Sequence, residues 1–424
     1  MKADPNTMPH PDLIAHHRQT CRDIIRLAPG IWTAVGYAAA NVHLIDGSRT
    51  ATIIDTTEST EAAANVLAEF RKLTDKPVGR IIYTHSHRDH ISGASVFTDG
   101  SVPIIAGHLF SSDLVGVNES RISANKALDR RTQAQFGIGL TDEERISLGC
   151  GPGDRPMKGL GAGHIEPTER IAKDKVVDLD GVAAKLILSP GETPDHMVVW
   201  LPEQGILFCG DNWYHAFPNL YAIRGTPYRD FATWAQSLGQ LASLQSEVLS
   251  PGHTRPVFGA AAVQEVLTTT RAAILHVMRA TADGMDEGLS VDDIAASISL
   301  PEALASKPWL KELYGKLSWS VRAFAAGTLG WYDGNPTHLG TISSIDRARH
   351  MAHLAGGATA LMEAAVVAED LEWRLELCDH LMALGKPVQE LKAETLVQLA
   401  ESEINATARN TYLWEANRLR KAVQ

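Results

Sequence analysis

The sequence predicts an α/β fold, in which two β-sheets pack between helices, followed by an all-helical region. Three observations lead to this fold class. Strand-like and helix-like segments alternate over roughly the first 280 residues, in the order β, α, β and then α, β, α. A short run rich in histidine directly follows one apolar strand-like segment. Beyond residue 285 strand signals end, and the remaining segments have helical spacing.

The first elements are antiparallel strands. From about Pro29 to Thr57, the segments GIWTAVGYAAANVHLI and TATIIDTT are rich in apolar and β-branched residues, and Asp46-Gly47 between them favours a hairpin turn. The next segment, STEAAANVLAEFRKL, has helical spacing, with Ser59 or Thr60 as the N-cap. The short apolar run VGRIIYT then predicts a buried strand.

The later segments complete the predicted pair of sheets. Residues from His108 to about Arg131 look helical, whereas Gly137 to Gly163 are rich in Gly and Pro and predict a long loop. Further elements follow as strands KLILS, MVVWL and GILFC, a helix near residues 231–244, a strand SEVLS, and a long helix over about 260–282.

This pattern divides the chain into three parts. We expect an N-terminal extension over 1–28, a catalytic domain over 29–285 and a helical domain over 286–424. In the last part, Gly356-Gly357 and Gly385-Lys386-Pro387 are typical of stops between paired helices. The helical domain is interpreted as a cap or dimerisation domain.

Composition excludes several function classes. The formal net charge is −11, and no Lys/Arg cluster is long enough to follow a phosphate backbone, so nucleic acid is not an expected partner. No apolar run approaches the ~20 residues of a membrane span, and no secretion signal is recognisable at the start. The four cysteines are far apart and are expected to be free thiols. We therefore expect a cytoplasmic protein.

The histidine-rich run His85-Ser86-His87-Arg88-Asp89-His90 is the clearest functional signal. It places three imidazoles and one carboxylate at the end of an apolar strand, where a short turn can direct them to one point. His85 and His87 can project together to one metal ion, and Asp89 and His90 can reach a second ion nearby. Clustered imidazoles have no structural purpose of their own, so this run predicts a metal site.

The run resembles the signature of the metallo-β-lactamase superfamily, and the resemblance extends over roughly residues 29 to 260. It implies an αββα sandwich and further ligands: Asp211 matches a carboxylate that bridges two ions, and His253 in SPGHTRP matches the last ligand. Most members have His after Pro-Gly in the segment SPGETPDHM, where this chain has Glu192. His196, four residues on, is the alternative ligand and is otherwise interpreted as a residue of the substrate pocket. The implied ligand set is His85, His87, Asp89, His90, Glu192, Asp211 and His253.

Ligands of this N/O type suit two Zn²⁺ ions, although other divalent metals also accept them. Redox diiron members of the superfamily typically have Glu at the position of His87, so this chain is expected to catalyse hydrolysis. The nucleophile would be a hydroxide between the ions, with Asp89 and Asp211 at the catalytic centre. Asp89, Asp211, Glu192 and the hydroxide offset the charge of two zinc ions, which gives a formal sum of zero.

The segment DNWYHAFPNLYAIRGTPYRD resembles the type III zinc alkylsulfatases. In that family Glu also occupies the slot of Glu192, and the resemblance implies that Asn219 and Arg224 bind the anionic head of a sulfate ester. Arg224 would do so through the forked hydrogen bonds of its guanidinium. TLGWYDGNPTHL resembles the signature of the alkylsulfatase dimerisation domain, which implies a homodimer acting on a small, anionic substrate.

Two departures from that family bear on the substrate. The family tends to carry Ser-His-Asn, with a His proposed to protonate the leaving group, where this chain has Ser318-Trp319-Ser320. The chain also ends at Gln424, so we expect no sterol-carrier-like C-terminal domain. Two alternatives to a sulfate-ester hydrolase therefore stay open: a hydrolase of another ester, lactone or amide, including β-lactams, and a non-catalytic metal-binding scaffold.

Overall fold

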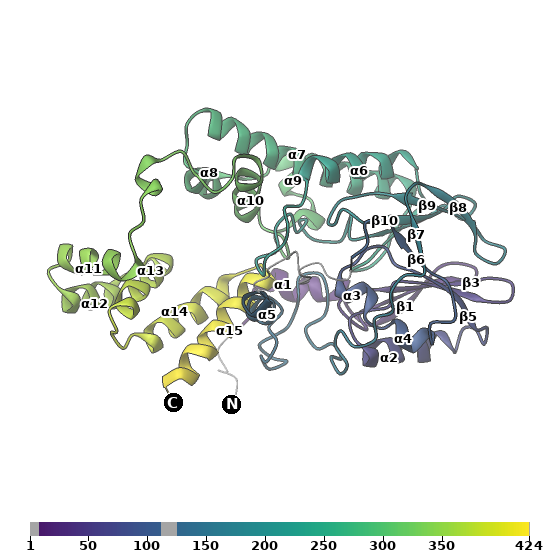
Figure 1. The fold of residues 1–424 in the computed structure, drawn as a ribbon, viewed down its shortest axis with the longest axis horizontal. Helices are drawn as coiled ribbons and strands as arrows, with labels where there is room; N and C mark the ends of the chain where they lie inside the picture. Colours follow the sequence, from purple (N-terminus) through teal and green to yellow (C-terminus); the bar gives the residue numbers. More distant parts are fainter. Residues whose placement is uncertain (1–7, 112–124, 424) are drawn as a thin grey trace.

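The computed structural model describes residues 8–111 and 125–423, which form a β-rich part and a helical part (Figure 1). Among these residues every strand lies between Asp23 and Phe258, and only helices follow. The expected change of character near residue 285 is confirmed, because the long helix α7 (Ala260–Asp286) ends there and no described strand comes after it.

The first sheet has seven strands in sequence order, β1-β2-β3-β4-β5-β6-β7. Its first four strands pair antiparallel, and the pairs β4–β5, β5–β6 and β6–β7 are parallel. The strands are β1 (Asp23–Ala28), β2 (Ile31–Val35), β3 (Val42–Asp46), β4 (Ala51–Ile54), β5 (Val78–Ile82), β6 (Ile104–Gly107) and β7 (Glu169–Ile171).

The second sheet has six strands in the order β13-β12-β11-β10-β9-β8. All neighbours are antiparallel except β11 and β12, which are parallel and are connected through a helix. The strands are β8 (Lys175–Asp178), β9 (Ala183–Leu188), β10 (Met197–Leu201), β11 (Ile206–Gly210), β12 (Val248–Pro251) and β13 (Val257–Phe258).

The two sheets pack face to face, with helices on both outer sides (Figure 1). Alternate residues of one strand face opposite layers. Val198 of β10 belongs to the apolar cluster with α6 (Phe231–Ser243) and α7, whereas Val199 belongs to the cluster between the sheets. On the other outer side, α2 (Thr60–Phe70) packs on the first sheet through Val66 and Phe70, close to α4 (Ala94–Phe97). The predicted αββα sandwich is therefore confirmed.

Several local predictions are also confirmed. Asp46 pairs with Ala51 across the predicted hairpin. Ser59 is the N-cap of α2, and its side-chain oxygen accepts a hydrogen bond from the Ala62 amide at 3.1 Å. Residues 137–163 contain no helix or strand beyond isolated bridges.

The helix expected from His108 is wrong at its start. His108 and Leu109 form a turn directly after the strand β6, and the described helix α5 spans only Asn125–Gln135. Residues 112–124 of that prediction lie outside the described residues. The strands β1, β6, β7, β8 and β13 were not predicted either, and β1 shows that residues before Pro29 contribute to the first sheet.

The helical part consists of short paired helices, and none of the described helices is long and apolar enough to cross a membrane. Gly356-Gly357 separates α11 from α12, and Gly385-Lys386-Pro387 separates α13 from α14, as predicted. The remaining helices among the described residues are α1 (Pro11–His16), η1 (His17–Gln19), α3 (Arg88–Ile91), α8 (Val291–Ser297), α9 (Glu302–Ala305), η2 (Pro308–Leu310), α10 (Leu317–Leu329), η3 (Pro336–Leu339), α11 (Ser344–Leu354), α12 (Ala358–Val367), α13 (Leu371–Ala383), α14 (Gln389–Ser402) and α15 (Ala406–Val423).

The last helix, α15, returns to the β-rich part and packs against α5 (Figure 1). The side-chain amide of Asn410 donates to the Ser147 carbonyl at 3.0 Å, and the buried Arg409 guanidinium donates to the Glu144 carbonyl. These contacts anchor the helical part to the long loop beside the candidate site.

Candidate metal centre

The histidine-rich run lies at the carboxyl end of β5, where the chain turns into the one-turn helix α3. His85 and His90 are fully buried, and the side chain of Asp89 is 31% exposed. The turn brings the imidazoles together: His85 Nε2 lies 2.9 Å from His87 Nδ1, and the rings of His85 and His90 are 4.2 Å apart.

Three further side chains reach the same point from the second sheet. Glu192 lies in the turn between β9 and β10, Asp211 directly follows β11, and His253 follows β12. Asp211 is central, because its Oδ1 is 3.3 Å from His90 Nε2 and its Oδ2 is 3.1 Å from His253 Nε2. Glu192 Oε1 lies 3.8 Å from His87 Nδ1. The structure therefore brings all seven predicted ligands together.

These side chains form three overlapping groups whose ligand atoms lie within 4.8 Å of one another. Asp211 and His90 each take part in two groups, and of these two residues Asp211 has two carboxylate oxygens with which it could contact both ions. The groups found among the described residues are His85, His90 and Asp211; Asp89, His90 and His253; and His87, Glu192 and Asp211.

The donor atoms fit divalent cations. His90 Nε2, Asp211 Oδ1 and Glu192 Oε2 are buried and have no hydrogen-bond partner among the described residues. Such atoms are costly to bury unless something binds them. Burial also holds the pKa values of His85 and His87 well below the usual range, which keeps both imidazoles in the neutral form that binds metal.

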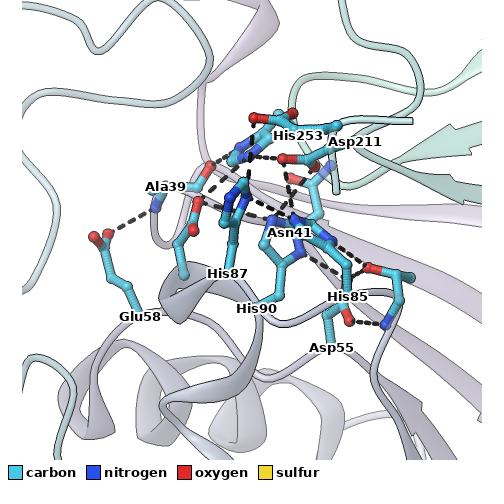
Figure 2. Close-up of polar contacts among 12 residues, drawn as sticks. Ala39, Asn41, Asp55, Glu58, His85, His87, His90, Asp211 and His253 are labelled. Carbon is cyan, nitrogen blue, oxygen red and sulfur yellow. Dashed lines mark hydrogen bonds and ion pairs between the residues drawn. The ribbon is translucent and has the colours of Figure 1, made fainter. Parts of the chain in front are cut away.

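The ring nitrogens that face away from the centre are held by other groups (Figure 2). His85 Nδ1 contacts Thr84 Oγ1 at 3.0 Å, and His90 Nδ1 contacts Asp55 Oδ2 at 2.8 Å. His253 Nδ1 contacts the Ala39 carbonyl at 2.7 Å. Contacts of this kind fix the orientation of metal-binding histidines and are typical of metal sites.

Sequence reasoning did not identify Asp55, which is buried at the end of β4. Its carboxylate accepts hydrogen bonds from the Thr84 amide and hydroxyl, both at 2.8 Å, as well as contacting His90. Its φ of 58° is a left-handed conformation that Asp and Asn adopt more readily than most residues. Asp55 thus orients the start of the metal-binding turn. The only sequence signal was its place at the end of the strand TATIID.

His196 is near the centre but lies in none of the three groups. Its Nε2 accepts a hydrogen bond from the Asp211 amide at 3.0 Å, and its ring stacks on His85 with centroids 4.9 Å apart. His196 therefore supports the backbone of Asp211, while Glu192 lies among the candidate ligands. His196 is also not among the residues that line the adjoining cavity.

That cavity, of about 460 Å³, is lined by His87, Glu192 and Arg224 among other residues. Arg224 is half-buried. Its backbone amide donates a hydrogen bond to Gln135 Oε1 at 2.8 Å, and the Nη1 of Arg224 donates to the Gly225 carbonyl at 3.0 Å. Asn219 is buried, and its backbone amide donates a hydrogen bond to Tyr214 Oη at 2.7 Å. The structure thus places Arg224 at the cavity, whereas Asn219 is not among the lining residues.

Sequence reasoning also missed Arg229, which is 4% exposed and lines the same cavity. Its Nη1 lies 2.5 Å from Glu192 Oε1. Burial raises the pKa of Glu192, and the neighbouring Arg229 guanidinium opposes that shift. The ring of Trp319, which stands where the resemblance expects a histidine, lies 5.9 Å from Lys316 Nζ.

Comparisons with known proteins agree with this site. Residues 35–253 match the metallo-beta-lactamase superfamily, and residues 290–422 match the alkyl sulfatase dimerisation family. A linear primary-alkylsulfatase of Pseudomonas sp. is 33% identical over 87% of this chain and 71% of its own length. An alkyl/aryl-sulfatase of Saccharomyces cerevisiae is 30% identical over 94% of this chain, which spans 64% of that relative.

The stereoselective inverting sec-alkylsulfatase Pisa1 from Pseudomonas sp. has a similar structure, with a TM-score of 0.88 and 27% identity. The match covers 99% of this chain and 70% of Pisa1. The similarity thus includes both the β-rich and the helical parts. The chain belongs to the metallo-β-lactamase superfamily of metal-dependent hydrolases, within the group of alkylsulfatases that carry an alkylsulfatase dimerisation domain.

Proposed function

We propose that this protein is a dinuclear zinc hydrolase that cleaves alkyl sulfate esters. The observation that carries the proposal is the position of Arg224 on a cavity that His87 and Glu192 also line. An anionic head in that cavity would contact a guanidinium next to the candidate metal centre. The chain spans 71% and 64% of the two curated relatives reported above, so their activity is proposed here on the basis of the site itself.

In the proposed centre the seven clustered side chains would hold two divalent ions, and the Asp211 carboxylate would be able to contact both. This N/O donor set suits zinc, and other divalent metals also accept such ligands. When bound, zinc would lower the pKa of a coordinated water toward ~7 and so would supply a hydroxide nucleophile at neutral pH.

The side chains of the protein have separate roles in this proposal. Asp55, Thr84 and the Ala39 carbonyl orient the imidazoles, because each holds the ring nitrogen that faces away from the centre. Arg224 binds two oxygens of the sulfate head, since guanidinium offers paired donors to an oxyanion. The neutral state of His85 and His87 keeps their nitrogens available to metal.

A hydrolase of another ester, lactone or amide, including β-lactams, is the second candidate, since the fold and ligand set serve a superfamily of hydrolases. A panel of substrates separates the two. Zinc-saturated protein should release inorganic sulfate from decyl sulfate, be inhibited by a chelator, and leave a lactone and a cephalosporin largely intact. Cleavage of the lactone or the cephalosporin without sulfate release would favour the second candidate, and inertness toward all three would favour a scaffold.

We further propose that two copies of the chain associate through the helical part. The segment around η3 exposes several large apolar side chains: Leu329 is 68% exposed, Trp331 76% and Leu339 62%. Apolar side chains gathered on one exposed segment are typical of an interface. They lie within the residues that match the dimerisation family.

A further inference from the structure

Arg229 is the most unusual charged residue near the candidate centre. It immediately precedes Asp230, the N-cap of α6, yet its side chain turns inward and is almost fully buried. Nη1 donates to Glu192 Oε1 and to the Asn219 carbonyl. Nε and Nη2 are buried and have no partner among the described residues. A buried guanidinium needs a counter-charge, and Glu192 is the carboxylate with which it forms an ion pair.

The two carboxylate oxygens of Glu192 therefore have different surroundings. One oxygen, Oε1, is held by Arg229, and the other, Oε2, is buried without a hydrogen-bond partner among the described residues. The same carboxylate belongs to the group with His87 and Asp211. A single Glu192 thus connects the guanidinium to the candidate metal position, and Arg229 leaves it one free oxygen as a ligand.

We propose that Glu192 and Arg229 act as one electrically neutral unit in the metal centre, equivalent in charge to a histidine ligand. This inference rests on the proposed function, because it requires metal at the His87 side of the centre. Two divalent ions carry four positive charges, and Asp89, Asp211, Glu192 and a hydroxide offset all four. Arg229 restores one positive charge. A histidine at position 192 without Arg229 would leave the same sum.

The consequence concerns the substrate. The ligands and the hydroxide alone sum to zero, and Arg229 adds one positive charge on the Glu192 side of the centre, beside the cavity, before Arg224 is counted. The buried Asp55 carboxylate adds a negative charge on the His90 side. A monoanionic sulfate ester in the cavity would thus meet positive charge from Arg229 as well as from Arg224. Arg229 acts here as a positioning residue, since its contacts are to Glu192 and Asn219.

The test is a double-mutant cycle on zinc affinity, measured by competition with a chromogenic chelator. Glu192→His alone leaves Arg229 buried and unpaired beside the ions, so zinc affinity at the weaker site should fall at least about tenfold, as for other groups that support metal ligands. Adding Arg229→Met removes that charge, so the double variant should recover most of the loss. A merely structural Arg229 predicts the opposite, because its removal would then add to the damage.

The outcomes can be told apart. Wild-type protein that binds fewer than two zinc ions would reject the proposed function itself. Two ions in wild type, with a double variant that binds zinc no better than Glu192→His, would overturn the inference alone, as would unaltered affinity in Glu192→His. If circular dichroism shows that neither variant at position 192 folds, the affinity for inorganic sulfate is compared in two other variants. Arg229→Lys should retain the wild-type sulfate affinity, and Arg229→Met should weaken it. Equal sulfate affinity in those two variants would also overturn the inference.

Discussion

Arg224 is held mainly through its backbone, and this leaves its charge available to a ligand. Gln135 Oε1 accepts a hydrogen bond from the Arg224 backbone amide, and within the described parts of the chain only the Gly225 carbonyl accepts from the guanidinium. Among the described residues no carboxylate lies within ion-pair distance of it. Burial and the neighbouring Arg229 both lower the pKa of Arg224, as expected for two guanidinium groups with too few anions between them. An anionic substrate would relieve that imbalance.

Replacing Arg224 with Ala should therefore impair sulfate esters selectively. Loss of a partly buried charge-assisted contact should cost about 2–5 kcal/mol, or at least about a thirtyfold loss in kcat/KM for an alkyl sulfate. A neutral ester should lose far less. The measurement is kcat/KM of Arg224→Ala on both substrates at equal zinc content, with the exposed Arg279→Ala as the control. Similar losses on both substrates would exclude Arg224 as the sulfate ligand.

His16 supplies a pH dependence outside the metal centre. It is buried, contacts the His215 carbonyl at 2.7 Å, and burial lowers its pKa from 6.5 to about 4. Below pH 6.5 the unfolded chain binds a proton there that the folded protein does not accept until about pH 4. The unfolding free energy should therefore fall as pH decreases across that window, by up to about 3 kcal/mol from this residue.

Urea unfolding at pH 7 and pH 5 tests this expectation. His16→Gln removes the titrating group, so the variant should lose less stability between the two pH values than wild type. Taking the difference between the two proteins cancels the contribution of the metal ligands. An identical pH dependence in both proteins would show that His16 does not titrate as described.

Among the elements, those predicted from the sequence are long or bounded by clear turns. The hairpin at Asp46-Gly47 and the helix capped by Ser59 are signalled by neighbouring residues, so local patterns suffice. The missed strands are different: β6, β7 and β13 have only four, three and two residues, and β8 is a largely exposed edge strand. Such segments are strands because neighbours pair with them, and no periodicity shows that.

The candidate site likewise has a part that local sequence predicts and a part that it does not. His85, His87, Asp89 and His90 are close in sequence, so their spacing alone predicted a metal site. The groups that hold the other ligands are distant in sequence: Ala39 lies 214 residues from His253, and Arg229 lies 37 residues from Glu192. The tertiary fold, and not local spacing, brings these partners together. The sequence therefore indicated the ligands but not their support.

The end of β4 should contribute measurably to metal binding through Asp55. Asp55→Asn preserves the shape and tolerates the left-handed backbone, but it removes the charge that holds His90. We expect a roughly 10–100-fold loss of zinc affinity with little change in fold. Chelator competition measures the loss, and Asp174→Asn on the surface is the matched control. Unchanged affinity in Asp55→Asn would show that Asp55 does not orient a ligand.

At the scale of the whole molecule, the exposed apolar segment before α11 predicts a dimer. Light scattering at micromolar concentration should give about twice the 45.9 kDa of one chain. Trp331→Glu together with Leu339→Glu should shift the mass to that of a monomer, because both side chains are largely exposed in the single chain. Phe258→Glu, an exposed apolar residue of the β-rich part, should not. A monomeric wild type would refute the proposal.

The central claim is that two zinc ions held between the sheets make this protein a sulfatase. Titration of metal-free protein with zinc, with inorganic sulfate release from an alkyl sulfate as the readout, tests it most directly. Sulfate release should rise with added zinc and reach its plateau at two equivalents per chain, because the seven clustered side chains form overlapping groups that would hold two ions. A plateau at one equivalent, or no sulfate release from folded protein that has bound two, would contradict the account.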